Sequence, residues 1–325
     1  MFLFAALPEP SPAGDVYKAF LSILFEGAPY ILLGTVFSGF IGVFLKNEHL
    51  SRVMPKNAMV ATFLGGLLGL VFPVCECAIV PVIRRLVEKG LPLGCAVAYM
   101  LAAPIVNPIV MISTMTAFGE FKTIAAAGTL AAAPMMLSRA SLGYAVAVLT
   151  GLILLRFGVR QVLRDRLADS IERPSGGGSG SSANLNFDQK LVHAMRAAMR
   201  DFLDTGMYFT IGVVLTALFN TQVNQAIFGQ LAAQPTIALP SLMGLAMVLS
   251  LCSTSDAFVA APMAAFSQAA KLAFLVFGPM MDIKLLFMYS SIFKRKVVLG
   301  LLLWLFIIIS LAATPWWTMI SSLAK

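Results

Sequence analysis

Two cysteines and a glutamate stand together inside an apolar run, VFPVCECAIVPVIRR, as Cys75, Glu76 and Cys77. Thiolates are soft ligands that suit Cu(I), zinc and comparable ions, and a carboxylate in a transmembrane segment is by default a functional residue. Residues two apart point to different sides of a helix or strand, so the cysteines meet on one ligand only in an irregular turn. Pro73 and Pro81 predict that turn.

A second polar cluster interrupts a later apolar run, LSLCSTSDAFVAAPM, at Cys252, Ser253, Thr254 and Asp256. Hydroxyls and an acid before an apolar run also suit a helix cap, so the hydroxyls have a structural explanation as well. We expect Cys252 to join the first two cysteines as a third metal ligand. The alternative is that the cysteines are small buried hydrophobes, which is the interpretation we favour for Cys95.

Each cysteine motif is followed by a proline break with a polar residue beside it. The first holds Pro104 and Asn107, and the second holds Pro279 and Asp282. Carbonyls freed by a proline are tolerated at membrane depth only where protein or a water-filled cavity satisfies them. Pro104, Asn107 and Asp282 are therefore candidate substrate-binding residues. Alternatively the breaks are packing kinks, and Lys284 pairs with Asp282 or snorkels to the interface.

The elements that position these motifs are membrane helices. Of 325 residues, 59% are hydrophobic and 12% are charged, which exceeds the apolar share of soluble domains. This composition predicts an all-α polytopic protein of the inner (plasma) membrane. The net charge of +8 is explained by basic loops on the cytoplasmic side, with no nucleic-acid partner. The apolar segments are 17–45, 58–83, 91–118, 123–157, 202–219, 237–266, 272–293 and 297–317.

A basic and then Gly/Ser-rich stretch divides the chain into an N-terminal half (1–157), a flexible cytoplasmic linker (158–190) and a C-terminal half (191–325). The halves share landmarks at a nearly constant offset of about 177 residues, as transporters built from repeats do. The pairs are Glu26 with Asp204, Tyr30 with Tyr208, Gly34 with Gly212, Cys75 with Cys252, Pro104 with Pro279, and Asn107 with Asp282.

Charge placement favours an inverted repeat. Basic residues cluster near 46–56, 84–89, 156–166 and 294–296, whereas 220–234 is uncharged. The basic clusters all fall on the cytoplasmic side if 58–83 and 237–266 are re-entrant hairpins that enter and leave on one side. The first half then starts outside and the second inside. The alternative is that these segments are broken spanning helices.

The motifs PVCECAIVPVIRRLVEKGLPL, YMLAAPIVNPIV and LCSTSDAFVAAPM, with the KLAFLVFGPMMDIK stretch that follows, resemble the predicted-permease family that contains the methylarsenite efflux permease ArsP. The resemblance runs through both halves and implies a permease. Many members carry a second cysteine pair where this chain has Cys252, Ser253, Thr254 and Asp256.

These features predict a secondary transporter, not an enzyme, that exports a thiophilic metal or metalloid species such as a trivalent organoarsenical. Cys75, Cys77 and Cys252 bind the substrate, and Glu76 or Asp256 exchanges a coupling proton. No P-loop is present and no cofactor is expected. The alternatives are a divalent, zinc-like metal transporter, a membrane thiol oxidoreductase, and an assembly subunit. The expected partners are the lipid bilayer, a small inorganic or organometallic substrate, and a membrane or cytoplasmic partner protein.

Overall fold

The structure is a computed structural model that describes residues 12–44, 55, 57–127, 132–165, 187–220 and 235–323. Before the stretch 166–186 the chain contains α1 (Pro12–Phe44), α3 (Ala58–Val71), α4 (Glu76–Glu88), α5 (Leu93–Ala102), α6 (Pro108–Ala117), α7 (Glu120–Ala127), α8 (Pro134–Leu154) and α9 (Val159–Val162). After it come α11 (Phe187–Asn220), α13 (Pro235–Leu249), α14 (Asp256–Ala260), α15 (Gln268–Met280), α16 (Ile283–Tyr289) and α17 (Arg295–Leu323).

Among the described residues, five helical segments are long and apolar enough to cross a membrane: Val16–Phe44, Pro134–Leu154, Asp188–Phe219, Gln268–Tyr289 and Arg295–Ser322. Four shorter apolar helices accompany them: Ala58–Val71, Leu93–Ala102, Pro108–Ala117 and Ile237–Leu249. Helices satisfy their own backbone groups, as the hydrocarbon of a bilayer requires. The prediction of an all-α polytopic membrane protein is confirmed.

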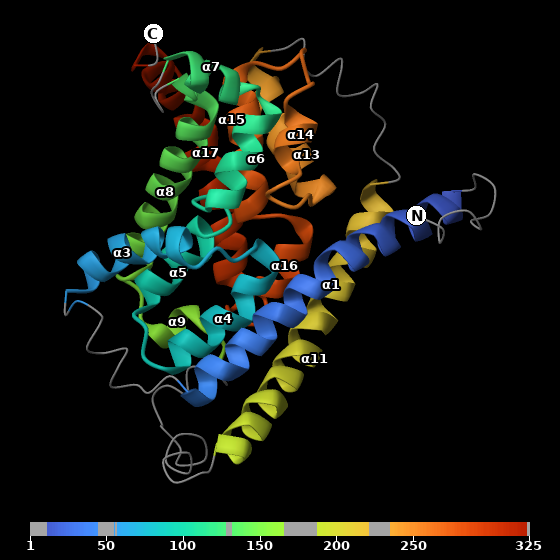
Figure 1. The fold of residues 1–325 in the computed structure, drawn as a ribbon, viewed down its shortest axis with the longest axis vertical. Coiled ribbons are helices and arrows are strands. Elements are labelled where there is room, and N and C mark those ends of the chain that lie inside the picture. The colour runs from blue at the N-terminus through green and yellow to red at the C-terminus, as the bar shows by residue number, and fades with distance from the viewer. Residues whose placement is uncertain are drawn as a thin grey trace.

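The two longest helices, α1 and α11, pack along each other and run in opposite directions beside the rest of the bundle (Figure 1). Close approach depends on Gly39, because an added Cβ there would collide with the carbonyl oxygen of Ala194. Near the same end, the carboxylate of Asp201 accepts from Ser38 Oγ at 2.7 Å and from Arg85 Nε and Nη2 at 2.9 Å each. This network joins α1, α4 and α11.

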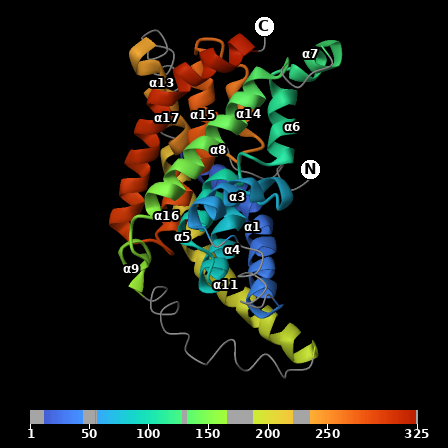
Figure 2. The same cartoon turned by 90° about the vertical axis from the view of Figure 1, so that its left-hand side faces the viewer.

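The remaining long helices form the body of the molecule, in which α8 and α17 run in opposite directions (Figure 2). Two tryptophans of α17 donate hydrogen bonds to α8: Trp304 Nε1 to Thr150 Oγ1 at 3.1 Å and Trp316 Nε1 to Ser141 Oγ at 2.9 Å. Helix α15 is buried over almost its whole length and packs on α8, α13 and α17. The body therefore draws its core from both halves.

Short helices meet at breaks inside the body. The chain is non-helical at 72–75 between α3 and α4, and helix α14 follows a turn at 250–255. A buried turn at 103–106 separates α5 from α6, and Asp282 separates α15 from α16. Pro73 lies in the predicted turn, but Pro81 does not, because α4 continues through it. The missing N–H of Pro81 leaves the carbonyl of Cys77 without its helical donor.

The end of α9 is tied to the chain just before α17. The amide of Arg164 donates to Ile292 O at 2.9 Å, and the amide of Lys294 donates to Val162 O at 3.0 Å, forming a single antiparallel bridge. This bridge, defined by residues 162–164 and 292–294, is called the backbone clasp below. Its two strands lie at the lower end of the molecule in Figure 1, next to α9.

Much of the predicted linker, 166–186, lies outside the described residues, as do 45–54, 56 and 221–234. The two ends of the 158–190 range lie in α9 and in the first turn of α11. The last turn of α4, the start of α11 and the clasp all lie at one end of the molecule (Figure 1), so the described basic clusters share that end. The inverted repeat and the re-entrant hairpins stay predictions.

Candidate functional site

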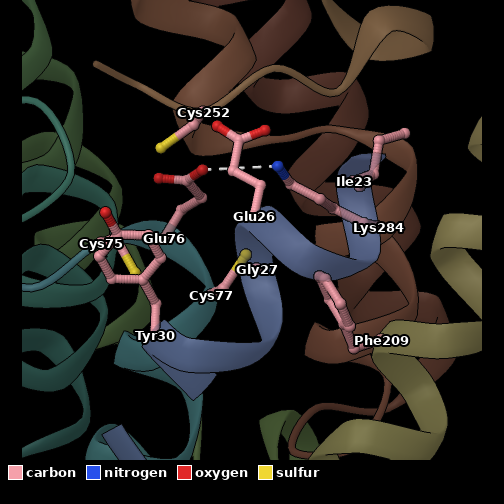
Figure 3. Close-up of a pocket in the computed structure, with 10 residues that line it drawn as sticks. All are labelled: Ile23, Glu26, Gly27, Tyr30, Cys75, Glu76, Cys77, Phe209, Cys252 and Lys284. Carbon is pink, nitrogen blue, oxygen red and sulfur yellow. Dashed lines mark hydrogen bonds and ion pairs between the residues drawn. The ribbon is translucent and has the colours of Figure 1, made fainter. Parts of the chain in front are cut away.

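A small cavity lies where α1 and α11 pack against the starts of α4 and α16. The residues that line it are Ile23, Glu26, Gly27, Tyr30, Cys75, Glu76, Cys77, Phe209, Cys252 and Lys284 (Figure 3). We call it the thiol cavity. Its volume of about 10 Å³ leaves room for roughly one water molecule. It brings together three of the four cysteines, two from the first half and one from the second.

The CxC motif reaches the cavity because α4 begins inside it. Cys75 is the N-cap residue with extended backbone (φ −72°, ψ 164°), and Glu76 is the first helical residue. The helix therefore begins inside the CxC motif itself. The change from extended to helical backbone turns the side chains of Cys75 and Cys77 toward the same cavity. The positive end of the α4 dipole points at the same place.

Glu76 is buried and ion-paired across the two halves. Its Oε1 lies 3.4 Å from Lys284 Nζ, on α16, and the same ammonium lies 3.5 Å from Asp282 Oδ2. Lys284 is 4% exposed and donates to the carbonyl oxygen of Ser250 at 2.8 Å. One buried cation thus serves two buried carboxylates, and Lys284 does not snorkel to the interface.

Ser250 presents that carbonyl from a strained conformation. Its φ is +46°, in the left-handed region that residues with a side chain rarely adopt. The hydroxyl of Ser250 donates to Met247 O at 3.0 Å and accepts from Thr216 Oγ1 at 3.4 Å, which holds the turn after α13. Strain of this kind persists where the surroundings fix the backbone, and here it aims a carbonyl at Lys284.

Ser253 connects the cavity to a second buried ion pair. Its hydroxyl donates to Glu76 Oε2 at 3.1 Å, and its carbonyl accepts from Arg139 Nη2 at 3.0 Å. Arg139, on α8, also lies 2.6 Å from Asp256 Oδ2 and donates to Thr114 Oγ1 at 2.8 Å. Arg139 Nε and Asp256 Oδ1 have no hydrogen-bond partner among the described residues. The two ion pairs are therefore linked through one serine.

The structure separates the predicted site residues into two groups. Cys75, Glu76, Cys77 and Cys252 line the thiol cavity, and Ser253 bonds to its carboxylate. The others lie outside it. They are Pro104 in the turn between α5 and α6, Asn107 as the N-cap of α6, Thr254 beside Cys252, Asp256 paired with Arg139, and Asp282 as the N-cap of α16.

Asn107 and Asp282 have the same local role. The Asn107 side chain accepts from Ile109 N at 2.9 Å, and the Asp282 side chain accepts from Leu285 N at 2.7 Å. Each caps the helix that restarts after a proline break. Thr254 contributes its carbonyl, which accepts a hydrogen bond from Ser113 on α6.

Four side chains that line the cavity or form the buried ion pairs are absent from the predicted site. Glu26 and Tyr30 of α1 line the cavity, and Figure 3 shows the Glu26 carboxylate on the same side as Cys252. Lys284 and Arg139 are the cations of the two buried pairs. In the sequence, Glu26 and Tyr30 were noted only for their counterparts in the second half, Asp204 and Tyr208. That pairing was the sequence signal that could have added them to the predicted site.

The donor set of the thiol cavity suits a soft, thiol-reactive species. Three thiols and two carboxylates line it, with the Lys284 ammonium beside them. Among the described residues, no three His, Cys, Asp or Glu side chains are grouped closely enough to hold a metal ion. The assignment of Cys75, Cys77 and Cys252 as metal ligands stays a prediction.

Comparison with known proteins places the chain in a family. Residues 13–314 match the family model ArsP_1, described as a predicted permease. The UPF0718 protein YcgR of Bacillus subtilis (strain 168) is 38% identical over 292 residues, covering 89% of this chain and 92% of the relative. A putative two-component membrane permease complex subunit of Streptococcus mutans serotype c (strain ATCC 700610 / UA159) is 35% identical over 294 residues, covering 89% and 91%. No solved structure matches. The chain belongs to the ArsP_1 family of predicted permeases.

Proposed function

We propose that this membrane permease is a secondary transporter that exports a small thiophilic metal or metalloid species through the thiol cavity. One observation carries the proposal: Cys75 and Cys77 from the first half face the same cavity as Cys252 from the second. A site shared between two halves changes its ligand set when the halves move relative to each other. Binding must also be weak enough for release, so a transport site does not need a closed cage of ligands.

Glu76 and Lys284 supply the charge compensation in this mechanism. Thiol ligation of a cation releases protons, and a carboxylate beside the thiols can accept one of them. Glu76 already accepts from Ser253 and lies against Lys284, so its charge is balanced when the site is empty of substrate. Exchange of substrate for a proton at Glu76 would couple export to the proton gradient.

The experiment is survival of sensitive cells that express the chain, challenged with methylarsenite, arsenite, zinc, copper or cadmium. The variants are Cys75→Ser/Cys77→Ser and Cys252→Ser at matched expression. Cys95→Ala is the control, because Cys95 is buried against α3 and does not line the cavity. We expect protection against one toxicant that both cysteine variants lose and the control keeps. Protection that survives both variants, or protection against none of the toxicants, would overturn the proposal.

A zinc-like divalent ion is the second candidate. The cavity holds the carboxylates of Glu26 and Glu76 beside the thiols, and mixed oxygen and sulfur donors suit borderline ions. The same assay separates the two candidates, because a divalent site needs the carboxylates as ligands. Glu26→Gln is expected to abolish protection against zinc but to leave protection against a trivalent arsenical largely intact.

A partner subunit belongs to the proposal as well. The Streptococcus mutans relative is described as a subunit of a two-component permease complex. We infer that this chain acts together with a second membrane or cytoplasmic protein. If so, purified chain alone in liposomes will transport more slowly than membranes that contain the complete complex.

A further inference from the structure

A second cavity lies beside the thiol cavity, between α1 and α11. Its volume is about 340 Å³, which falls in the range of small-molecule sites, whereas the thiol cavity has room for about one water molecule. Leu24, Ala28 and Ile31 line it on α1, and residues within 202–210 line it on α11. We call it the apolar cavity, since its lining is apolar except for Thr210 and backbone.

The apolar cavity opens toward the outer face of the α1–α11 pair. Leu203 is 62% exposed and Met207 is 56% exposed at its rim. Gly206, also in the lining, has nothing within 4 Å of the position a Cβ would take. In a membrane-spanning pair of helices, such a face meets lipid hydrocarbon. In a bilayer, the opening of the cavity would therefore face hydrocarbon.

Among the described residues, Phe209 is the one side chain that lines both cavities. The ring is 2% exposed and lies against the bare backbone of Gly27, where an added Cβ would collide with it. On α1, Gly27 lies in the lining of the thiol cavity and Ala28 in that of the apolar cavity, so the two cavities occupy adjacent faces of one helix. A rotation of Phe209 would connect them.

We propose that the apolar cavity binds an uncharged, apolar small molecule taken from the hydrocarbon of the bilayer, and that Phe209 separates it from the thiol cavity. The inference rests on the proposed function for the role of the thiols. It adds a binding site, a route and a residue that controls the passage. A bare inorganic cation cannot use this route, because desolvating its charge in hydrocarbon is too costly.

The test is the rate at which thiols are labelled in protein reconstituted in liposomes. The background is Cys95→Ala, which leaves Cys75, Cys77 and Cys252 as the described cysteines. N-Phenylmaleimide, which is neutral and dissolves in the bilayer, is compared with N-(4-sulfophenyl)maleimide, a charged reagent of similar size present on both sides of the membrane. Mass spectrometry gives the labelled residue and the rate.

Phe209→Ala is expected to raise the rate with the neutral reagent about tenfold or more and to change the rate with the charged reagent little. Gly206→Leu fills the open space of the apolar cavity and is expected to slow the neutral reagent. Phe219→Ala is the matched control, because Phe219 is exposed on the same helix and lines neither cavity.

Two results would overturn the inference. One is equal acceleration of both reagents by Phe209→Ala, which would indicate access from water. The other is a neutral-reagent rate that neither Phe209→Ala nor Gly206→Leu changes. Labelling does not require transport, so a failure of the toxicant assay leaves this result interpretable. A chain that protects cells but shows no lateral labelling would keep the proposed function and lose this route.

Discussion

The Lys284 ammonium holds two buried carboxylates, which makes the site asymmetric at the level of single residues. Both oxygens of Glu76 have a partner, Ser253 and Lys284, whereas Asp282 accepts from Leu285 N through Oδ1 only. Among the described residues, Asp282 Oδ2 has no hydrogen-bond partner and depends on Lys284 for charge compensation. Removing one member of a buried ion pair leaves an uncompensated charge in low dielectric, which costs more than the pair contributes. The expected loss of stability therefore grows with the number of buried charges that each variant leaves without a partner.

Lys284→Met is expected to destabilise the protein by about 3–5 kcal/mol, because it leaves the buried carboxylates of Glu76 and Asp282 without their cation. Glu76→Gln is expected to cost only about 1–3 kcal/mol, since it keeps an acceptor for Ser253 while Lys284 keeps Asp282. Thermal unfolding of the purified variants in one detergent checks the order. An equal or larger loss for Glu76→Gln would show that Lys284 is not the hub of the network.

The residues that sequence alone located are those of rare type in an apolar run. Cysteines and an acid in such a run stand out, and Cys75, Glu76, Cys77 and Cys252 all line the cavity. Arg139 did not stand out, because its partner Asp256 lies 117 residues away and only the fold brings them together. For the same reason Lys284 was paired with its neighbour Asp282, while its contact with Glu76, 208 residues away, was missed.

At the scale of the elements, two glycines set the position of the site. A Cβ at Gly34 of α1 would lie 2.7 Å from the carbonyl oxygen of Ala78 at the start of α4. A Cβ at Gly212 of α11 would lie 2.7 Å from Lys284 Cα at the start of α16. These glycines were predicted to be equivalent landmarks, and each allows a long helix to touch the backbone of a short one that carries a site residue.

Gly34→Ala and Gly212→Ala are each expected to destabilise the protein by about 1–3 kcal/mol, because backbone must move to admit the methyl group. Both should also weaken protection in the toxicant assay, since α4 and α16 shift. Gly206→Ala on α11 has open space around its Cβ and is expected to be neutral or to stabilise the helix by roughly 0.5–1 kcal/mol. Melting temperatures of the three variants test this, and equal effects would contradict it.

The helices themselves were easier to predict than their ends. Five of the eight apolar runs contain a described helix long and apolar enough to span a membrane, because length and hydropathy identify such helices. The runs 58–83, 91–118 and 237–266 instead break into shorter helices. The prolines were less informative. Pro81 and Pro279 lie inside α4 and α15, whereas Pro104 lies in a true break. A proline removes one hydrogen bond, and packing of neighbouring helices decides whether the helix continues through it.

At the scale of the whole molecule, the arrangement of basic residues predicts its orientation. The start of α11, the last turn of α4 and the backbone clasp share one end of the molecule (Figure 1), and they carry clusters of Lys and Arg. Basic loops stay in the cytoplasm. Helices α5 and α6 lie one above the other (Figure 1) and together extend along the body as Gln268–Tyr289 does. From this arrangement we predict that both the start of α1 and the end of α17 lie outside.

Reporter fusions test this orientation. Green fluorescent protein inserted after Asp165 is expected to fluoresce, because that end is cytoplasmic. Alkaline phosphatase fused after Leu323 is expected to be active, because it folds only outside the cytoplasm. The reciprocal fusions should be silent. Phosphatase activity after Asp165 would exclude this orientation.

The backbone clasp has a consequence for how the chain is assembled. The halves are held together by the clasp, the Glu76–Lys284 and Arg139–Asp256 pairs, and the packing of α1 on α11 and of α8 on α17. None of these contacts needs an unbroken peptide between 166 and 186. Two separately translated pieces, 1–175 and 176–325, should therefore find each other in the membrane and purify as one complex. An unbroken chain would then increase the rate at which the two pieces assemble more than it increases the stability of the assembled permease.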